Sequence, residues 1–541
     1  MHHNQHIADL GPVIRKHGVR FVILCPGSRN APLIQLFTSS PEFHCYSIVD
    51  ERSAGYVALG MATYLKEPVV VVTTSGTAVM NLFPAVGEAF QQHIPLVLLT
   101  ADRPRESILQ FNNQATDQYA PYFNHTRGFF EFPSEVRTES ELQDALRAVD
   151  QLLNVAAGAE SGPVHINIPL AEPLYEKLPQ RVLASFPSQE SPIPVEELVL
   201  NMDVEMVGKK ILVMAGMGVQ KKEILEILSK LSGDLQLAVV AENIANLPSE
   251  QFLPYPELIL GGASDTELEK LAPDVVIAFG GQVVSKRLKL FIQSLNRVEV
   301  IQLEGAPLPF LNELFGCVGK EIKQSKNSYL ETWKFIESRE VNRAGNYIND
   351  APFSNLTAIH KALSTVPAGT VVHLGNSATI RYTQLMPRRT DLTFYSNRGT
   401  SGIDGSVSTA VGAAMVSNDL HLLLVGDLSF VYDSNALWNN CFPENLKIII
   451  LNDGGGGIFR LLKGPDSMEF FEEFSVTHHP VSLELLSQSF GKGFQRVQQE
   501  DELEDKLEAL FLPGSSISIL EVDTTQRENS RIFKQFFNRN Q

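Results

Sequence analysis

The sequence predicts an α/β protein of three domains, each with a parallel sheet flanked by helices. Short β-branched runs alternate with helical patterns along the 541 residues. Runs such as VVVVTTSG, which ends at Gly76, are apolar throughout, and this is typical of parallel strands covered on both faces. At roughly 150 residues per domain, the length corresponds to three or four domains.

Two polar segments, 184–194 and 340–355, are rich in Pro, Ser or Asn and lack clear periodicity. They are therefore candidate linkers between domains. The predicted domains are residues 1–185, 195–340 and 355–541, and each is of ordinary domain size.

The expected strands follow one another in a regular order. From the N-terminus they are FVILCPGS, VVVVTTSG, PLVLLTAD, PVHINIP, KKILVMAG, DVVIAFGG, HLLLVGD and KIIILND. The first and last domains also share an order of elements. In both, a small-residue helix is followed by a strand, a helix and a second strand. Gly76 and Ala101 are 25 positions apart, as are Gly426 and Leu451. This spacing predicts one α/β unit used twice.

Composition and charge exclude several classes of partner. The chain has 44 basic and 62 acidic residues, a formal net charge of −18 and no basic run, so we expect no binding to nucleic acid or to an anionic membrane. No apolar stretch is long enough to span a bilayer. The start, MHHNQHIADL, lacks a secretory signal, and the expected compartment is the cytoplasm. Four cysteines without CxxC spacing are expected to be reduced core residues: Cys25, Cys45, Cys317 and Cys441.

Aspartates and glycines follow two neighbouring strands of the predicted C-terminal sheet. Gly426 and Asp427 close one strand, and the next ends in Asn452 and Asp453 before four glycines. Ligands of open α/β sheets bind beyond the carboxyl ends of strands, so both turns can face one site. Asp427 and either Asp453 or Asn452 offer hard oxygens to Mg²⁺, and a diphosphate is expected beside the metal. The alternative is a capping aspartate with an ordinary glycine-rich turn.

The spacing of these residues resembles the thiamine diphosphate motif, in which GD is followed within about thirty residues by Asn and a glycine-linked carbonyl. Asp453 follows Asp427 by 26 positions. Leu428 stands where the motif has Gly, and Asp453 where it usually has a second Asn. Enzymes with this cofactor also carry a glutamate at a strand-to-helix junction, and Glu51 ends the run CYSIVDE at such a junction. The alternative for Glu51 is a helix N-terminal acid favoured by the helix dipole.

Four arginines lie inside glycine, serine or asparagine turns instead of on charged helix faces. They are Arg29, Arg103, Arg381 and Arg398. Because guanidinium groups bind carboxylates in a bidentate manner, these positions indicate acidic substrates. Taken singly, each arginine also fits a solvated or structural ion pair.

Seven motifs appear in order: CPGSRNAPL, DERSAG, TTSGTAVMNLFPAVGEA, LTADRP, YSNRGTSGIDG, GDLSF with YDSNALW, and GGGGIF. Over nearly the whole chain, the sequence resembles the 2-succinyl-5-enolpyruvyl-6-hydroxy-3-cyclohexene-1-carboxylate synthase family of menaquinone biosynthesis. The resemblance implies a thiamine diphosphate-binding fold with pyrimidine-binding, central and diphosphate-binding domains. It implies a transferase that decarboxylates 2-oxoglutarate and adds the resulting succinic semialdehyde carbanion to isochorismate.

The resemblance also implies roles for individual residues. Glu51 activates the cofactor, while Asp427, Asp453 and the Gly455 carbonyl hold Mg²⁺ or Mn²⁺, with Asn452 in reserve. Ile403 supports the cofactor from below, and further cofactor contacts come from Gly426, Leu428, Ser429, Ile458 and Phe459. The expected 2-oxoglutarate set is Ser377, Arg381 and Arg398, and the expected isochorismate set is Ser28, Arg29, Arg103, Asn113, Gln114, Lys286 and Arg287. From the residues alone, the three bulky apolar side chains equally fit an ordinary core.

Oligomeric state and rival functions are further expectations. In the family, Glu51 and Asp427 of one site belong to different chains, so a homodimer or a dimer-of-dimers tetramer is expected. His93, His125 and His165 share no metal spacing and are expected to be core or surface residues, and Arg460 an exposed helix-start arginine. One rival is another thiamine diphosphate 2-oxoacid decarboxylase or carboligase. The other is a non-catalytic paralogue, suggested by Asp453 in place of Asn.

Overall fold

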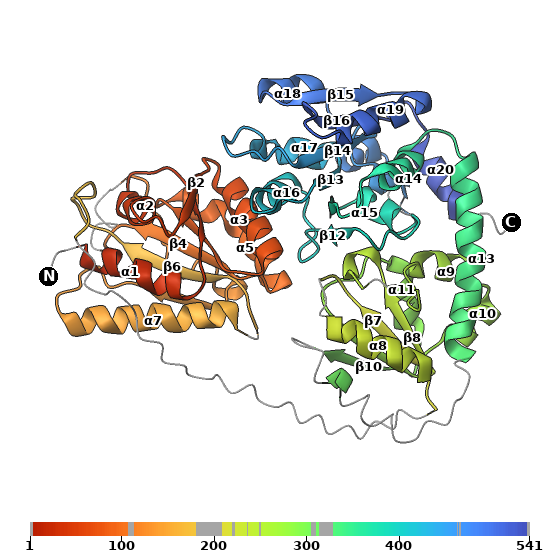
Figure 1. Cartoon of the computed structure of the whole chain (residues 1–541), viewed down its shortest axis with the longest axis horizontal. Coiled ribbons are helices and arrows are strands. Elements are labelled where there is room, and N and C mark those ends of the chain that lie inside the picture. Colours follow the sequence, from red (N-terminus) through yellow and green to blue (C-terminus); the bar gives the residue numbers. More distant parts are fainter. Residues whose placement is uncertain are drawn as a thin grey trace. The chain divides into compact units, whose positions relative to one another are not determined.

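The computed structural model describes residues 4–105, 113–158, 160–179, 208–218, 222–234, 236–247, 250–303, 310–312, 328–461, 464 and 467–537. These residues form three parallel sheets with helices between the strands (Figure 1). The predicted α/β class is therefore confirmed. The eight predicted strands are all present, as β1 (Phe21–Leu24), β3 (Val69–Thr73), β4 (Leu96–Asp102), β6 (Val164–Pro169), β7 (Ile211–Ala215), β9 (Val275–Phe279), β13 (His421–Gly426) and β14 (Leu446–Asn452).

The structure adds strands that the apolar runs did not reveal. They are β2 (His44–Ser47), β5 (Gly128–Glu131), β8 (Leu237–Ala241), β10 (Glu299–Leu303), β11 (Val371–Leu374), β12 (Thr393–Tyr395), β15 (Gly493–Val497) and β16 (Ile517–Asp523). Most of them are edge strands. Because an edge strand such as β10 is partly exposed, its sequence is less apolar than that of a central strand.

Contacts divide the chain into two compact units. The first unit takes its residues from 1–197, 399–418 and 432–445, and the second from 198–398, 419–431 and 446–541. Each unit is described by itself below. The division into domains at 1–185, 195–340 and 355–541 stays a prediction.

The first unit contains a six-stranded sheet in the order β2-β1-β3-β4-β6-β5. Neighbouring strands are parallel, and Val69 to Val72 of β3 are fully buried. Helix α7 begins with a capping box between Thr138 and Glu141, and it lies beside α1 (Figure 1). The helices of this unit are α1 (Gln5–Lys16), α2 (Ala31–Thr38), α3 (Glu51–Leu65), α4 (Thr77–Asn81), α5 (Phe83–Gln92), η1 (Phe123–His125), α7 (Glu139–Ala157), α16 (Ser406–Met415) and η3 (Ser434–Ala436).

Helix α16 belongs to the first unit, although it follows strand β12 in the chain. It packs against α3 with backbone contact at two glycines. A Cβ atom on Gly60 would lie 2.0 Å from the Thr409 carbonyl oxygen, and one on Gly412 would lie 1.9 Å from the Val57 carbonyl oxygen. Larger residues at these positions would push the two helices apart.

The second unit contains two sheets, in the orders β10-β9-β7-β8 and β12-β11-β13-β14-β16-β15. The order of the second sheet repeats that of the first unit strand for strand. The predicted duplication is therefore confirmed at the level of topology. The helices of this unit are α8 (Lys222–Asp234), η2 (Asn243–Ala245), α9 (Pro256–Gly262), α10 (Asp265–Leu271), α11 (Lys286–Ser294), α13 (Ser328–Asp350), α14 (Asn355–Thr365), α15 (Ala378–Thr383), α17 (Asp427–Tyr432), η4 (Gly457–Leu461), η6 (Glu472–Val476), α18 (Leu483–Ser489), α19 (Glu500–Phe511) and α20 (Asn529–Phe537).

One predicted linker is wrong over most of its length. Residues 340–350 of the segment 340–355 complete the long helix α13. Its buried face includes two acids among apolar residues, and this hid the helical pattern in the sequence. Glu337 pairs with Lys334 at 2.8 Å, and Glu340 pairs with Arg339 at 2.7 Å. The other predicted linker, 184–194, lies outside the described residues.

Two expectations on membranes and cysteines have an outcome here. Among the described residues, no helix is both long and apolar enough to cross a membrane. Cys25, Cys45 and Cys441 form no disulfide, but only Cys25 is the core residue that was expected, because Cys45 and Cys441 are half-buried. Cys317 lies outside the described residues.

Candidate active site

The carboxyl end of β13 presents the first candidate metal ligand. The strand ends at Gly426, and Asp427 opens α17. Asp427 is 1% exposed, and its Oδ2 lies 3.0 Å from Nε2 of His479. This hydrogen bond raises the pKa of His479 above its ordinary value. A buried carboxylate is suited to binding a metal ion, whose positive charge compensates its own.

Asp453, the second candidate ligand, lies in the glycine loop after β14. Burial, and then the negative charge of Asp427, raise the pKa of Asp453 to about 7. The loop closes tightly around this carboxylate, because a Cβ atom on Gly457 would lie 2.0 Å from Asp453 Oδ2. Gly455 has φ +142°, and a Cβ atom there would lie 2.6 Å from the Val476 carbonyl oxygen. Glycine is therefore required at position 455, and a larger residue at position 457 would displace the Asp453 carboxylate.

The negative charges of the two candidate carboxylates favour a divalent cation between them. Two like charges in a buried place repel, and a metal ion between them relieves that repulsion. The described part of the chain contains no group of three or more His, Cys, Asp or Glu side chains that could hold a metal ion. The predicted set has two carboxylates and a backbone carbonyl, so it depends on phosphate oxygens to complete the coordination shell, as Mg²⁺ sites commonly do.

Asn452, the reserve ligand, has its side chain engaged elsewhere. Its Nδ2 donates to Glu521 Oε1 at 2.7 Å, and its Oδ1 accepts from the Gly454 N–H at 3.1 Å. These contacts hold the end of β14 and the start of the glycine loop. The geometry favours Asp453 over Asn452 as the partner of Asp427.

The predicted apolar cofactor contacts are not core residues. Ile403, Leu428 and Ile458 are half-buried, and Phe459 is 38% exposed. Ser429 is buried. A Cβ atom on Gly426 would meet no atom within 4 Å, so space is open in front of this glycine. In the second unit, Leu428, Ile458 and Phe459 offer apolar surface close in sequence to the aspartates, which suits an aromatic cofactor. Ile403 lies in the first unit.

Glu51 opens helix α3 in the first unit, as predicted. Asp50 supplies the helix cap, because its side chain accepts from the backbone N–H groups of Arg52 and Ser53. The Glu51 carboxylate is therefore not needed as a cap. Its Oε2 accepts a hydrogen bond from Asn81 Nδ2 at 3.3 Å. Together with Asp50, its charge adds to the effect of burial in raising the pKa of the Cys25 thiol.

Most of the predicted isochorismate residues lie together in the first unit. Arg103 donates to the Asn113 carbonyl at 2.8 Å, and Gln114 Nε2 donates to the Ser75 carbonyl at 3.4 Å. Burial, and then the nearby charge of Arg103, lower the pKa of Arg29. The Nε atoms of Arg29 and Arg103 are buried and have no hydrogen-bond partner. Two such guanidinium groups favour an anionic ligand.

Ser28, also predicted for this set, is bound to a neighbouring loop. Its hydroxyl lies 2.7 Å from the Tyr175 hydroxyl. Tyr175 is 75% exposed. Because water can take the place of Ser28 at this exposed tyrosine, exchanging the partner for a ligand would cost Ser28 little free energy.

Ser377, Arg381 and Arg398, the predicted 2-oxoglutarate residues, lie in the second unit. Ser377 precedes α15, and Arg381 lies within it. Arg398 donates to Asn376 Oδ1 at 3.1 Å, and Asn376 Nδ2 donates to the Asn397 carbonyl at 2.7 Å. The Arg381 Nε atom is buried and has no hydrogen-bond partner.

Sequence reasoning missed a third cation near these two arginines. Burial lowers the pKa of Lys289 on α11, and the charges of Arg398 and Arg381 lower it further. The carboxylate of Glu242 acts in the opposite direction. A lysine near two arginines suits a ligand with carboxylate groups. Nothing in the sequence marked Lys289, because it follows the basic pair Lys286 and Arg287 and reads as part of a charged helix face.

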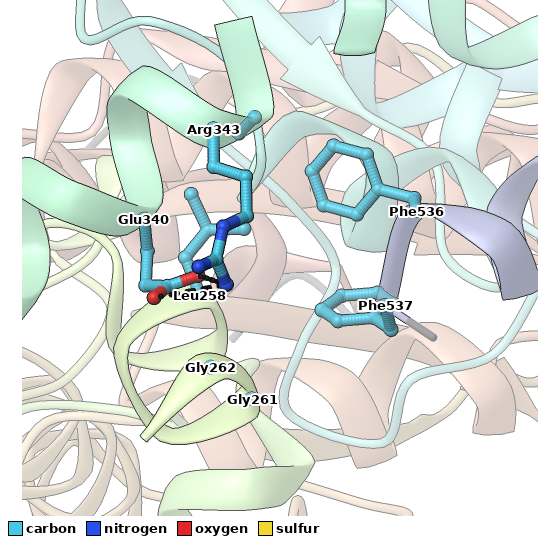
Figure 2. A pocket seen from close by; sticks show the side chains of 8 residues that line it. Leu258, Gly261, Gly262, Glu340, Arg343, Phe536 and Phe537 are labelled. Atoms are coloured by element: carbon cyan, nitrogen blue, oxygen red, sulfur yellow. Dashed lines mark hydrogen bonds and ion pairs between the residues drawn. The ribbon is translucent and has the colours of Figure 1, made fainter. Parts of the chain in front are cut away.

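Arg287 itself is engaged by other residues of the second unit. Its Nε lies 3.1 Å from Glu257 Oε1, and its guanidinium carbon lies 4.7 Å from the ring centroid of Phe537. Phe537 lines a small pocket between helices α9, α13 and α20, in which Glu340 and Arg343 are paired (Figure 2). Lys286 is exposed. In this structure Lys286 is thus free to reach a ligand, whereas Arg287 is bound to Glu257.

The histidines behave as expected. His165 is 1% exposed and lies 2.7 Å from Thr100 Oγ1, while exposed His93 contacts Arg127, and His125 packs on Phe83. Arg460 pairs with Glu472 at 2.5 Å. His479, which holds Asp427, was missed because 52 positions separate the two residues.

Comparisons with known proteins agree with these features. Residues 5–121 match the thiamine pyrophosphate enzyme N-terminal TPP binding domain, and residues 375–522 match the corresponding C-terminal TPP binding domain. The chain is 37% identical to 2-succinyl-5-enolpyruvyl-6-hydroxy-3-cyclohexene-1-carboxylate synthase of Desulfotalea psychrophila, over 92% of this chain and 94% of that protein. It is 34% identical to the protein of the same name from Flavobacterium psychrophilum and 35% identical to that of Christiangramia forsetii, over 96% of each chain. The chain therefore belongs to the 2-succinyl-5-enolpyruvyl-6-hydroxy-3-cyclohexene-1-carboxylate synthase family of thiamine pyrophosphate enzymes.

Proposed function

We propose that this enzyme decarboxylates 2-oxoglutarate and transfers the resulting succinic semialdehyde unit to isochorismate. The products are 2-succinyl-5-enolpyruvyl-6-hydroxy-3-cyclohexene-1-carboxylate and CO₂, within menaquinone biosynthesis. Membership of the family supports this reaction. The observation that carries the proposal is the buried Nε atom of Arg381, which has no hydrogen-bond partner and which a carboxylate oxygen of the substrate would satisfy.

Thiamine diphosphate, when bound, supplies the electron sink that decarboxylation of a 2-oxoacid requires. Asp427, Asp453 and the Gly455 carbonyl would hold the Mg²⁺ or Mn²⁺ ion beside its diphosphate. Glu51 would hold a proton at its carboxylate and share it with the aminopyrimidine ring. The half-buried side chains of Ile403 and Ile458 would exclude water from the reacting face.

The two groups of cations would orient the two acidic substrates. Ser377, Arg381, Arg398 and Lys289 would bind the carboxylates of 2-oxoglutarate. The isochorismate carboxylates would be bound by the first-unit set, Ser28, Arg29, Arg103, Asn113 and Gln114, and by the second-unit pair, Lys286 and Arg287. Unpartnered guanidinium nitrogens in both groups support this assignment, because a ligand oxygen would satisfy them.

We further propose a homodimer or a dimer of dimers, in which each cofactor lies between Glu51 of one chain and Asp427 of another. Apolar side chains are exposed beside both half-sites. Val49 and Met80 flank Glu51 and Asn81 with 50% and 38% of their surfaces exposed. In the second unit, Phe459, Phe470 and Phe474 are exposed near the glycine loop in the sequence. Such surfaces are typical of faces that a second copy covers.

The sequence also predicts that the enzyme acts in the cytoplasm, and this stays a prediction.

The test follows loss of isochorismate in the presence of purified protein, thiamine diphosphate, Mg²⁺ and 2-oxoglutarate. We expect loss of isochorismate only when every component is present. Release of CO₂ from 2-oxoglutarate with isochorismate untouched would show that the acceptor is wrong. Preferential turnover of pyruvate would assign the chain to another 2-oxoacid decarboxylase or carboligase. Calorimetry without any heat from thiamine diphosphate and Mg²⁺ would indicate a non-catalytic paralogue.

A further inference from the structure

Helix α3 begins with Glu51. Residues 432–435 of the same unit contact the first turn of this helix on both sides of Glu51. The Arg52 side chain donates to the Tyr432 carbonyl at 2.7 Å, and its guanidinium carbon lies 4.6 Å from the centroid of the Tyr432 ring. Asn435 Nδ2 donates to Asp50 Oδ2 at 2.7 Å. Residues on both sides of Glu51 are therefore tied to this segment.

A third connection runs through serine hydroxyls to a buried acid. Ser53 Oγ lies 2.9 Å from Ser408 Oγ. Ser408 donates its backbone N–H and its hydroxyl to Asp433, at 2.6 and 2.7 Å. Asp433 is fully buried, and burial raises its pKa to about 7. A buried carboxylate costs folding free energy that an apolar residue would not, so its presence here points to a role beyond packing.

The direction of the Glu51 side chain depends on the backbone of this turn. Its own side-chain contact, to Asn81 Nδ2, is long at 3.3 Å and holds the carboxylate weakly. A group that shares a proton with a ligand must be held within a fraction of an ångström of its working position. Supporting contacts to the turn that carries Glu51 can supply that precision.

We infer that Asp433 is a positioning residue for Glu51, acting through Ser408 and Ser53 on the first turn of α3. The inference rests on the proposed role of Glu51. Docking of α3 does not depend on it, because Gly60 and Gly412 bring α3 and α16 into backbone contact. Tyr56 on α3 also donates to Asp404 at 3.0 Å. Loss of Asp433 should therefore loosen the first turn and leave the rest of the helix in place.

The test compares Asp433→Ala and Asp433→Asn with wild type in the full-length protein. We expect amide hydrogen exchange in the first turn of α3 to quicken at least about tenfold in Asp433→Ala, with the second half of the helix unchanged. With thiamine diphosphate and Mg²⁺ bound, kcat should fall by about tenfold or more. The KM for 2-oxoglutarate and the Kd for the cofactor should stay within about twofold, because Glu51 is not proposed to bind either carboxylate or diphosphate.

Two further variants separate positioning from general destabilisation. Asp433→Asn keeps an acceptor for the Ser408 N–H and should recover most of kcat. Asp150→Ala is the matched control, since Asp150 is a buried acid of the same unit that pairs with Lys16 at 2.8 Å, on another helix. It should lower stability without quickening exchange in the first turn of α3.

The inference is overturned if exchange in the first turn is unchanged in Asp433→Ala, or if kcat falls no more than in Asp150→Ala. Should Asp433→Ala fail to fold, Ser408→Ala tests the same link, because it removes the hydroxyl bridge and keeps the backbone donor. If wild type binds no cofactor and consumes no isochorismate, the proposed function is wrong. The exchange measurement still decides whether Asp433 holds the turn.

Discussion

Asn452 and Asp453 are adjacent in the chain but make different contacts. The Asn452 amide joins Glu521 to the glycine loop, at 2.7 and 3.1 Å. The Asp453 carboxylate lies against Gly457 and feels the charge of Asp427. Asp453 is therefore the better candidate for a metal ligand, and Asn452 stabilises the end of β14 and the glycine loop.

We predict that Asp453→Ala raises the Mg²⁺ concentration needed for half-maximal cofactor binding by about tenfold or more, as loss of a metal ligand does. Asn452→Ala should lower the free energy of unfolding by about 1–3 kcal/mol, because it leaves Oε1 of the buried Glu521 without its donor, while Arg496 still holds Oε2, and should change the Mg²⁺ requirement little. Calorimetric Mg²⁺ titrations with thiamine diphosphate present, and urea unfolding of the apo-proteins, measure the two effects. The reverse pattern would make Asn452 the ligand.

Residues that follow a local pattern were predictable, and residues brought in by tertiary structure were not. Glu51 and Asp427 stand where strands give way to helices, and sequence motifs mark such junctions. His479 and Lys289 reach the candidate site from elements far along the chain, so no local spacing reveals them. Arg287 was predicted from its motif, but whether it meets Glu257 or a ligand depends on how α9 and α11 pack.

At the scale of elements, apolar runs predicted strands well and helix packing poorly. Central strands such as β3 and β14 are buried along their whole length, and their composition shows it. The pairing of α3 with α16 depends on two glycines separated by more than 350 positions. A glycine within a helix does not indicate which other helix packs against it. Helix α13 was missed near its end because the buried acids Glu337 and Glu340 break its apolar stripe.

Strand β6 carries a buried histidine that makes stability depend on pH. Burial lowers the pKa of His165 from 6.5 to about 3. Between these values the unfolded chain binds a proton that the folded chain does not, so folding stability is lost as pH falls. We predict that wild type loses stability relative to His165→Gln by up to about 1.4 kcal/mol per pH unit below 6.5. Urea unfolding at pH 7, 6 and 5 measures this difference, and parallel pH profiles for the two proteins would contradict it.

At the scale of the whole molecule, the residues predicted to bind the cofactor lie in two units, with Glu51 in the first and Asp427 and Asp453 in the second. The six-stranded sheets share one topology, but the predicted cofactor residues follow strands that are not equivalent in the two sheets. Glu51 follows the edge strand β2 of one sheet, whereas Asp427 and Asp453 follow central strands of the other. The number of chains in the assembly is not encoded in any local pattern, because it depends on which exposed faces meet.

The proposed assembly predicts that two inactive variants restore each other. Glu51→Gln should lower turnover by about a hundredfold through loss of a positioned acid–base group, and Asp427→Ala should prevent metal binding. If each site takes Glu51 from one chain and Asp427 from another, a mixed dimer has one site with both changes and one with neither. After co-refolding or co-expression in equal amounts, half of the dimers should be mixed. Turnover should then recover to about one quarter of wild type.

This recovery separates two arrangements that a single variant cannot distinguish. If Glu51 and Asp427 of the same chain formed one site, every site in a mixed dimer would carry one of the two changes, and turnover would stay at the level of the separate variants. A matched mixture of Glu51→Gln with Asp453→Ala should recover to the same extent, because Asp453 lies with Asp427 in the second unit. A mixture of Asp427→Ala with Asp453→Ala should not recover, since both changes fall on the same side of every site.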